Sequence, residues 1–140
     1  IERLNRPDVR IRFAQELSAI SSCAIDISDG LLADLGHIIE ASDCSAVVRL
    51  DHMPVSAAAA YYFLHYEEDV IDWSLLLTQG DDYELCFTVS ADNEAELEKL
   101  AEKHGVRVSC IGEITAGDQL RVVDANNDPV QIDGAGYQHF

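Results

Sequence analysis

The spacing of hydrophobic positions changes several times along the chain, and each change marks the edge of a predicted element. Alternation with a period of two is typical of a strand, whereas a period near 3.6 is typical of an amphipathic helix. We expect helices at residues 9–19, 30–41, 56–64 and 69–77 and from residue 90 or 93 to 104, and strands at residues 23–27, 45–50, 83–89, 106–114 and 120–124. This order of strands and helices predicts an α/β (α+β) domain in which one mixed sheet is flanked by helices.

The predicted helix at residues 56–64 has a strongly apolar sequence. Its four alanines favour the helical state, and Ser56 is a suitable N-cap. Tyr61, Tyr62 and Phe63 follow directly, and we expect these aromatic side chains to pack in the core. A platform that stacks nucleic-acid bases is disfavoured, because no basic residues interleave with the aromatics.

One stretch combines a strand, a turn and a helix start with two carboxylates. Residues 24–27 are an apolar run interrupted only by Asp26, which predicts a buried strand. Ser28, Asp29 and Gly30 are residue types that end strands and begin helices. The helix that follows has its apolar positions on one face: Leu31, Leu32, Leu35, Ile38 and Ile39. A carboxylate in a buried strand needs a partner or a metal ion, since charged groups are seldom buried alone.

These polar residues suggest a binding site at the end of the strand. Asp26 and Ser28 are expected to project from the same face of the strand, with Asp29 at the turn beside the helix N-terminus. Carboxylates together with the free N–H groups of a helix start can hold Mg²⁺ and phosphate. Alternatively, Ser28 or Asp29 only caps the helix. That alternative leaves Asp26 unexplained, so both interpretations stay open at this point.

Two further segments carry residue types that are suited to binding. Residues 80–85 read Gly-Asp-Asp-Tyr-Glu-Leu and place three carboxylates around a tight turn that leads into a strand. Such a turn could hold a cationic ligand or a metal ion, or it could simply be exposed to solvent. Residues 136–140 read Gly-Tyr-Gln-His-Phe, and their aromatics could stack on a ring or pack onto the domain. The sequence alone leaves both questions open.

The overall negative charge limits which classes of ligand the chain is expected to bind. The 140 residues, about one domain's worth, include 26 acidic and 9 basic side chains and carry a formal net charge of −17 at pH 7. Nucleic-acid binding depends on lysine and arginine contacts with phosphate, so no nucleic-acid partner is expected. A phosphorylated ligand would need divalent cations to bridge its oxygens to the carboxylates. A site that handles phosphates should therefore depend on Mg²⁺.

The ends and the hydropathy of the chain bear on its location. No stretch approaches the roughly 18 apolar residues of a membrane span, and residues 1–7 lack the apolar core of a signal peptide. We therefore expect a cytoplasmic protein with no membrane partner. The chain starts without methionine, which suggests a piece of a longer protein. Residues 1–7 are expected to be a linker and residues 8–140 a single domain.

The four cysteines do not follow the spacing of a metal site. They lack a Cys-x-x-Cys pair and a Cys/His pairing, so zinc is not expected. Each lies in or beside an apolar stretch, which predicts buried, reduced thiols at all four positions: Cys23, Cys44, Cys86 and Cys110.

Four motifs taken together resemble the second half of the thiamine-monophosphate kinase family. They lie at residues 25–31 with 34–38, at residues 80–87, at residues 110–114 and at residues 136–140. They occur in the family's order and span nearly the whole chain. The family belongs to the superfamily of aminoimidazole ribonucleotide synthetase and selenophosphate synthetase. The resemblance implies the C-terminal domain fold of that superfamily, and transfer of the ATP γ-phosphate to thiamine monophosphate with several Mg²⁺ ions.

The resemblance also implies roles for individual residues. Asp26 and Asp29 would be magnesium ligands, and Ser28 would contact the nucleotide. Asp81 stands where the family has an acidic residue that contacts the thiamine substrate, and Tyr137 matches an aromatic position near the thiamine ring. The family commonly has Gly-Glu-Asp-Tyr-Glu where this chain has Gly-Asp-Asp-Tyr-Glu, so the acidic side chain at position 81 is shorter here. The implied reaction is direct in-line transfer, which requires no nucleophilic side chain.

The resemblance further implies what lies outside this chain. In the family, an N-terminal domain supplies most of the nucleotide pocket, further magnesium carboxylates and the dimer interface. This chain would then be inactive alone, and the full-length protein would be a homodimer. Two alternatives stay open: another ATP-using synthetase of the same superfamily, and a non-catalytic acidic domain that binds a metal ion or a small cation.

Overall fold

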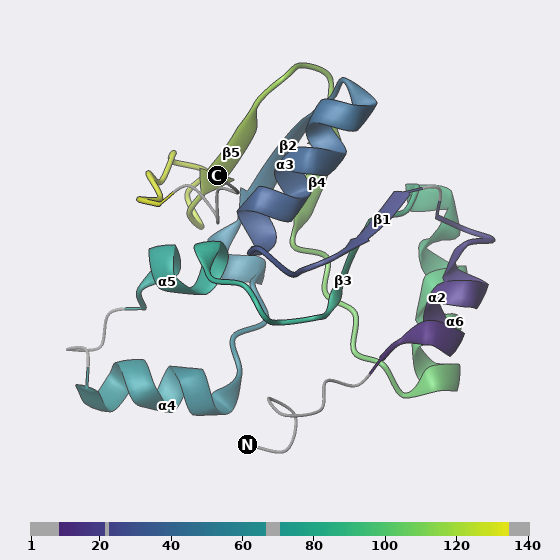
Figure 1. Cartoon of the computed structure of the whole chain (residues 1–140), viewed down its shortest axis with the longest axis horizontal. Helices are drawn as coiled ribbons and strands as arrows, with labels where there is room; N and C mark the ends of the chain where they lie inside the picture. Colours follow the sequence, from purple (N-terminus) through teal and green to yellow (C-terminus); the bar gives the residue numbers. More distant parts are fainter. Residues whose placement is uncertain (1–8, 22, 67–70, 135–140) are drawn as a thin grey trace.

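The structure is a computed structural model that describes residues 9–21, 23–66 and 71–134. Helices and strands are interspersed along the chain, with α4 and α5 in succession and the strands β4 and β5 at the end (Figure 1). The helices are α2 (Ile11–Leu17), α3 (Leu31–Ser42), α4 (Ala57–Tyr66), α5 (Trp73–Thr78) and α6 (Glu94–His104), with 3₁₀ turns η1 (Leu50–His52) and η2 (Ala91–Asn93). The strands are β1 (Cys23–Asp26), β2 (Ser45–Arg49), β3 (Leu85–Thr88), β4 (Gly112–Thr115) and β5 (Leu120–Val123). Within the described ranges, no helix has both the length and the apolar character needed to span a membrane.

The strands form two sheets, whereas the sequence pattern predicted one. β1 pairs antiparallel with β3, so that Cys23 lies opposite Thr88 and Asp26 opposite Leu85. In the second sheet, β2 is the central strand; it is antiparallel to β4 and parallel to β5. The predicted class is confirmed, because this second sheet is mixed and helices flank it. Hydrophobic periodicity identifies strands but not their partners, which is why the division into two sheets could not be read from it.

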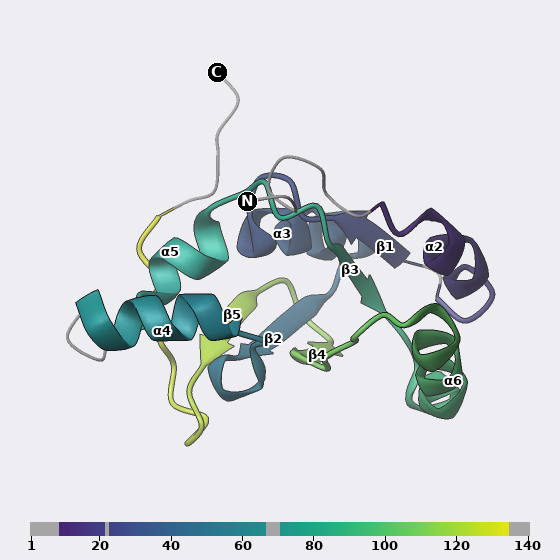
Figure 2. The ribbon, with the colours of Figure 1, turned by 90° about the horizontal axis from the view of Figure 1, so that it is seen from below.

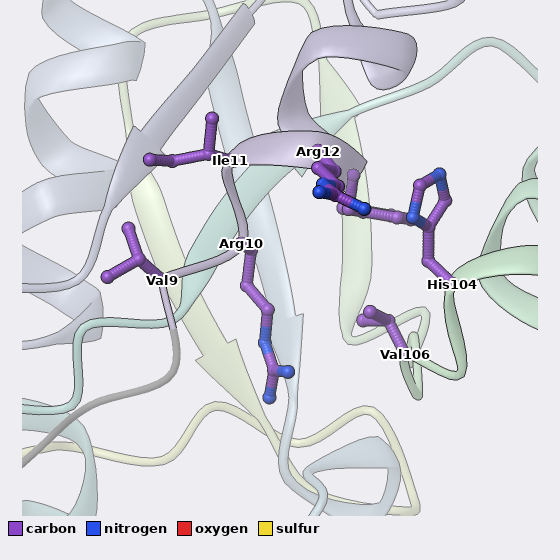
Figure 3. A pocket seen from close by; sticks show the side chains of 7 residues that line it. Val9, Arg10, Ile11, Arg12, His104 and Val106 are labelled. Atoms are coloured by element: carbon purple, nitrogen blue, oxygen red, sulfur yellow. The ribbon is translucent and has the colours of Figure 1, made fainter.

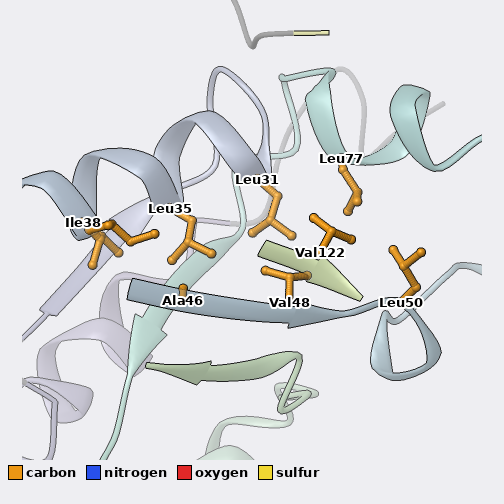
Figure 4. Close-up of a cluster of buried hydrophobic side chains, with 9 residues drawn as sticks. Leu31, Leu35, Ile38, Ala46, Val48, Leu50, Leu77 and Val122 are labelled. Carbon is orange, nitrogen blue, oxygen red and sulfur yellow. The ribbon is translucent and has the colours of Figure 1, made fainter. Parts of the chain in front are cut away.

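Helix α3 covers one face of the three-stranded sheet and forms the main core with it (Figure 4). Four of the five residues of β2 are buried, as expected for the central strand of a covered sheet. The apolar face predicted for the helix is confirmed. The buried residues of this core are Leu31, Leu35, Ile38, Ile39, Ala46, Val48, Leu50, Leu77 and Val122. The core therefore fixes the N-terminus of α3 and the loop that precedes it.

Helices α2 and α6 lie side by side at one end of the molecule and form a smaller cluster (Figures 1 and 2). Its buried residues are Phe13, Leu17 and Leu100. A hydrogen bond from Lys103 of α6, and a second contact with His104, lower the pKa of the Glu16 carboxyl on α2. Gly105 ends α6 with a φ of 61°, in agreement with the predicted helix end. This cluster packs α2 against α6. The main core, and not this cluster, holds the start of α3 and the loop before it.

Helix α4 contradicts the expectation that its aromatic residues are buried. Ser56 accepts a hydrogen bond from the Ala59 amide at 3.1 Å, as expected of an N-cap residue. Of the ten helical residues, however, Phe63 is the buried one. The exposed aromatic and aliphatic residues are Tyr61, Tyr62, Leu64 and Tyr66. Successive helical side chains point about 100° apart, so three consecutive aromatics cannot all face the domain.

The cysteines agree with the prediction in oxidation state but not all in burial. All four are free thiols. Cys23, Cys44 and Cys86 are half-buried, and desolvation, with Cys23 and Asp34 nearby, raises the pKa of the Cys86 thiol to about 11. Cys110 is exposed and contradicts the expectation; it precedes β4 and lies outside the strands of the described residues.

Candidate functional site

The predicted magnesium ligands lie at the end of β1 and in the following loop, which we call the 26–29 loop. The side chains of β1 alternate between half-buried and exposed, and Asp26 is exposed. The expectation that residues 23–27 form a buried strand is therefore wrong, because alternate side chains of this two-stranded sheet face solvent. Ser28 and Asp29 are half-buried, and the N-cap of α3 is Gly30 instead of either of them.

The second acidic segment, which we call the 80–83 turn, meets this loop directly. The carbonyl oxygen of Ser28 accepts a hydrogen bond from the Asp81 amide at 3.0 Å, and the carbonyl of Ile27 accepts one from the Tyr83 amide at 2.8 Å. The Ile27 amide donates to the Glu84 carbonyl at 2.8 Å. These bonds continue the pairing of β1 with β3 beyond the strand ends. Two motifs that are far apart in the sequence thus form one acidic surface.

Two glycines permit this close approach of backbones. A Cβ atom on Gly80 would lie 1.9 Å from the carbonyl oxygen of Ser28, so a side chain has no room there. Gly30 has a φ of 116°, and a Cβ atom at this position would lie 2.7 Å from backbone atoms of Thr78, the last residue of α5. Both positions require glycine because the two loops pack backbone against backbone.

Asp81, the predicted substrate contact, is exposed and interacts with a tyrosine two residues later. Its carboxylate accepts a hydrogen bond from the Tyr83 hydroxyl at 3.1 Å. This bond and the charge of Asp81 raise the pKa of the Tyr83 phenol, with smaller contributions from desolvation, Asp26 and Asp29. Tyr83 therefore lies within electrostatic reach of all three predicted acidic site residues. Its place inside the acidic turn was the available sequence signal for it.

A further carboxylate lies beneath the loop, on the first turn of α3. Asp34 is only 3% exposed. Its Oδ2 atom accepts hydrogen bonds from the backbone N–H groups of Ser28 at 2.8 Å and Asp29 at 3.1 Å. Sequence reasoning alone does not single out this residue. The signal was nevertheless present, because position 34 falls on the apolar face of its helix, where an acid needs hydrogen-bond donors.

The carboxylate oxygens of this surface are of the type that Mg²⁺ binds in proteins. In the described part of the chain, no group of three or more histidine, cysteine, aspartate or glutamate side chains is arranged to hold a metal ion. Mg²⁺ usually takes one or two carboxylates and completes its shell with water and phosphate oxygens. Asp26 and Asp29 therefore fit a magnesium ion that is bound together with a phosphorylated ligand. Tyr137, the remaining predicted site residue, lies outside the described residues.

A separate surface cavity of about 440 Å³ lies where α2 begins, next to the end of α6 (Figure 3). None of the predicted site residues within the described ranges lines it. Arg10, at its edge, forms an ion pair with Glu84 at 3.4 Å, just after the 80–83 turn. The lining residues are Val9, Arg10, Ile11, Arg12, Phe13, His104 and Val106.

Comparison with known proteins relates both acidic segments to one group of enzymes. The chain is 42% identical over 141 residues to the thiamine-monophosphate kinase of Escherichia coli (strain K12), and 39% identical over 142 residues to that of Haemophilus influenzae. These alignments cover 100% and 99% of this chain and 42% of each relative. The chain thus spans less than half the length of these relatives, and the similarity to thiamine-monophosphate kinases that the motifs suggested is confirmed.

Solved structures and a family model also show similarity to thiamine-monophosphate kinases and related proteins. The thiamine-monophosphate kinase from Stenotrophomonas maltophilia K279a matches with a TM-score of 0.76 and 42% identity, over 86% of this chain and 37% of that chain. A structure of AaThiL complexed with AMPPCP and TMP matches with a TM-score of 0.74 and 25% identity, over 99% of this chain and 40% of that chain. Residues 4–125 match the family model described as AIR synthase related protein, C-terminal domain. The chain therefore belongs to the family of AIR synthase related proteins and corresponds to their C-terminal domain.

Proposed function

We propose that this chain is the C-terminal domain of a thiamine-monophosphate kinase, which transfers the γ-phosphate of ATP to thiamine monophosphate and yields thiamine diphosphate. The observation that carries the proposal is the contact between the 26–29 loop and the 80–83 turn, where the backbone amide of Asp81 donates to the Ser28 carbonyl. The relatives at about 40% identity carry the thiamine-monophosphate kinase name, and AaThiL was solved with AMPPCP, an ATP analogue, and TMP. The hydrogen bond between the loop of Asp29 and the turn of Asp81 supports a shared site for phosphate and thiamine.

Each site residue then has a role that suits its position. Asp26 and Asp29 would hold Mg²⁺, which when bound would neutralise phosphate charge. Ser28, between them, would contact the nucleotide. Asp81 would attract the cationic thiazolium group, because opposite charges favour each other at short range. Tyr137 would stack near the thiamine ring, by resemblance alone.

The chemistry of this domain would be positioning and electrostatics. Phosphoryl transfer in line needs the donor and acceptor oxygens to be held in register, and it needs the phosphate charge to be offset. The loop and the turn are joined by backbone hydrogen bonds, so the two binding segments keep a fixed separation. No side chain of the surface needs to act as a nucleophile.

The rest of the enzyme would lie outside this chain. We infer that an N-terminal domain, joined through residues 1–7, supplies further magnesium carboxylates, most of the nucleotide pocket and a homodimer interface. We therefore expect residues 8–140 to fold but not to turn over when alone. Use of ATP suits a cytoplasmic location, and the net charge of −17 gives no support to a nucleic-acid partner.

The decisive experiment measures thiamine diphosphate formation by the complete protein that contains this chain. Thiamine monophosphate and ATP are supplied with and without Mg²⁺. We expect product only with Mg²⁺, and a loss of at least about 100-fold in Asp29→Asn if this carboxylate holds the ion. Asp118→Asn is the matched control, since Asp118 is an exposed acid outside both segments.

Two results would redirect the assignment. No product from a well-folded complete protein would favour one of the other ATP-using synthetases of the superfamily. Binding of Mg²⁺ or thiamine diphosphate without any turnover would favour a non-catalytic acidic binding domain. Full activity in Asp29→Asn would remove this residue from the metal site while leaving the kinase activity in place.

A further inference from the structure

We propose that Asp34 is the positioning residue of the 26–29 loop. Its carboxylate fixes the backbone from which Ser28 and Asp29 project, and it is not itself a magnesium ligand. This inference rests on the proposed function in that the loop is taken as the magnesium and nucleotide site. The hydrogen bonds that support it are independent of which reaction the protein catalyses.

The burial of Asp34 requires an explanation of this kind. The residue is 3% exposed on a helix face whose neighbours, Leu31, Leu35 and Ile38, belong to the main core. A carboxylate in such surroundings is costly unless hydrogen-bond donors compensate it. Both donors to Oδ2, at 2.8 and 3.1 Å, come from the proposed site loop and neither from the core. The loop amides, and not the surrounding core residues, therefore compensate the burial of this carboxylate.

The geometry differs from an ordinary helix cap. In the usual capping box, a side chain in the first turn reaches back to the N-cap amide. Here the N-cap is Gly30, and Asp34 reaches past it to the two preceding amides, those of Asp29 and Ser28. The carboxylate thus holds residues that lie outside the helix. A negative charge in the first turn is also favoured by the helix dipole.

The loop is held from its opposite side as well. The carbonyl oxygen of Ser28 accepts the hydrogen bond from the Asp81 amide at 3.0 Å, while the amide of the same residue donates to Asp34. Both polar groups of the Ser28 backbone are therefore occupied, one by the helix and one by the 80–83 turn. Of the two restraints, only the one from Asp34 depends on a side chain, so substitution can remove it selectively.

Magnesium and nucleotide binding should depend on this restraint. A metal ligand projecting from a loop loses affinity when the loop samples other conformations, and partners that orient ligands typically contribute about 10–100-fold. Asp34 would strengthen metal binding indirectly, by holding the backbone of the metal ligand Asp29 in one conformation. Because Oδ2 already receives two N–H groups, its lone pairs are directed at the loop backbone.

The test uses two substitutions with opposite expectations, made in the complete protein that contains this chain. Asp34→Ala removes the acceptor. Asp34→Asn keeps an acceptor oxygen and removes the charge. One readout is the hydrogen-exchange rate of the Ser28 and Asp29 amides without metal. The other is the dissociation constant of Mn²⁺, used as a magnesium probe and titrated in the presence of AMPPCP.

We expect Asp34→Ala to accelerate exchange at the two loop amides and to raise the Mn²⁺ dissociation constant by roughly tenfold or more. The amide of Leu100, in the separate α2–α6 cluster, should keep its protection, which shows that the change is local. Asp34→Asn should keep both properties near those of the unchanged protein. Asp29→Asn should weaken Mn²⁺ binding without accelerating exchange at Ser28.

Two outcomes would overturn the proposal. Unchanged exchange in Asp34→Ala would mean that the carboxylate does not hold the loop. Loss of Mn²⁺ binding in Asp34→Asn to the extent seen in Asp29→Asn, with normal exchange, would make Asp34 a ligand instead. If Asp34→Ala unfolds, Asp34→Leu serves as the second variant that lacks an acceptor, and the Asp34→Asn comparison still decides between positioning and ligation. Failure of the kinase assay alone would leave these readouts intact, so the two proposals fail separately.

Discussion

At the level of single residues, the hydrogen bond between Tyr83 and Asp81 determines how the phenol titrates. The hydroxyl donates to the carboxylate at 3.1 Å, so loss of the proton would place two negative charges side by side. The pKa of Tyr83 is therefore raised above its usual value of about 10. We expect Asp81→Asn to lower this pKa, because it removes the largest cause of the shift.

The measurement is a pH titration of the ¹³C-labelled tyrosine ring carbons by NMR. Asp118→Asn is the control and should leave the Tyr83 titration unchanged, since that acid lies outside the turn. An identical titration curve in Asp81→Asn would show that the hydroxyl does not contact this carboxylate in solution.

Sequence reasoning at this scale selected candidate acids from their type, their spacing and the family resemblance. Asp26, Asp29 and Asp81 were expected at a site, and the structure brings the loop of the first two against the turn of the third. It did not single out Asp34 and Tyr83, whose contacts with Ser28, Asp29 and Asp81 depend on the fold and not on their own spacing. It also misjudged Asp26, since an apolar run of four residues does not reveal that alternate side chains face solvent.

At the level of elements, alanine substitutions of two glycines should change the free energy of unfolding in opposite directions. Gly80 packs against the Ser28 carbonyl, and a Cβ atom there would lie at 1.9 Å from it. We expect Gly80→Ala to lower the free energy of unfolding by about 1–3 kcal/mol, because the loop and the turn must separate. Gly36, in the middle of α3, has no atom within 4 Å of its Cβ position. We expect Gly36→Ala to raise the free energy of unfolding by about 0.5–1 kcal/mol, through higher helix propensity.

Urea denaturation of the two variants, each compared with the unchanged protein, measures this difference. The pair controls for the general effect of adding a methyl group. If Gly80→Ala were as stable as Gly36→Ala, the close contact between the two segments could not exist in solution.

The sequence predicted the positions of the helices and strands better than it predicted which of their residues are buried. The predicted helices are present with shifted ends, and the capping residues Ser56 and Gly105 were identified correctly. The strand predicted at residues 106–114 is shorter and shifted, because the regular pairing with β2 covers only β4 (Gly112–Thr115). Helix α4 shows the limit of composition, since an apolar sequence gave no information on which of its faces the domain covers.

At the level of the whole molecule, the excess of acidic residues opposes folding. The chain has 26 acidic but only 9 basic side chains, so the acids outnumber the lysines and arginines that could pair with them, as Arg10 does with Glu84, and net repulsion remains. We expect the urea midpoint to rise when NaCl increases from roughly 0.01 M to 0.1 M, because the screening length falls from about 30 Å to about 10 Å.

An uncharged solute at equal osmolarity is the control for general solvent effects. A midpoint that stays constant or falls with salt would mean that ion pairs outweigh repulsion in the folded state. The same repulsion should weaken when divalent cations bind, so Mg²⁺ should raise the midpoint more than NaCl of equal ionic strength.

The class of the fold followed from the order of the elements, but the strand partners did not. β1 pairs with β3 and β2 with both β4 and β5, and all of these pairings join distant segments. Local periodicity carries no information about such pairings, because each strand would satisfy its pattern with any suitable neighbour. Only the three-dimensional arrangement shows that two motifs form one surface.

The pairing of Asp26 with Leu85 also has a consequence for the order of events during protein synthesis. β1 leaves the ribosome roughly 60 residues before its partner strand. At about 5–20 residues per second, the nascent chain carries an unpaired strand edge for several seconds. During that interval the loop lacks the 80–83 turn that holds it, and a chaperone or another nascent chain can occupy the free edge. The acidic surface therefore cannot exist on the growing chain until β3 has emerged.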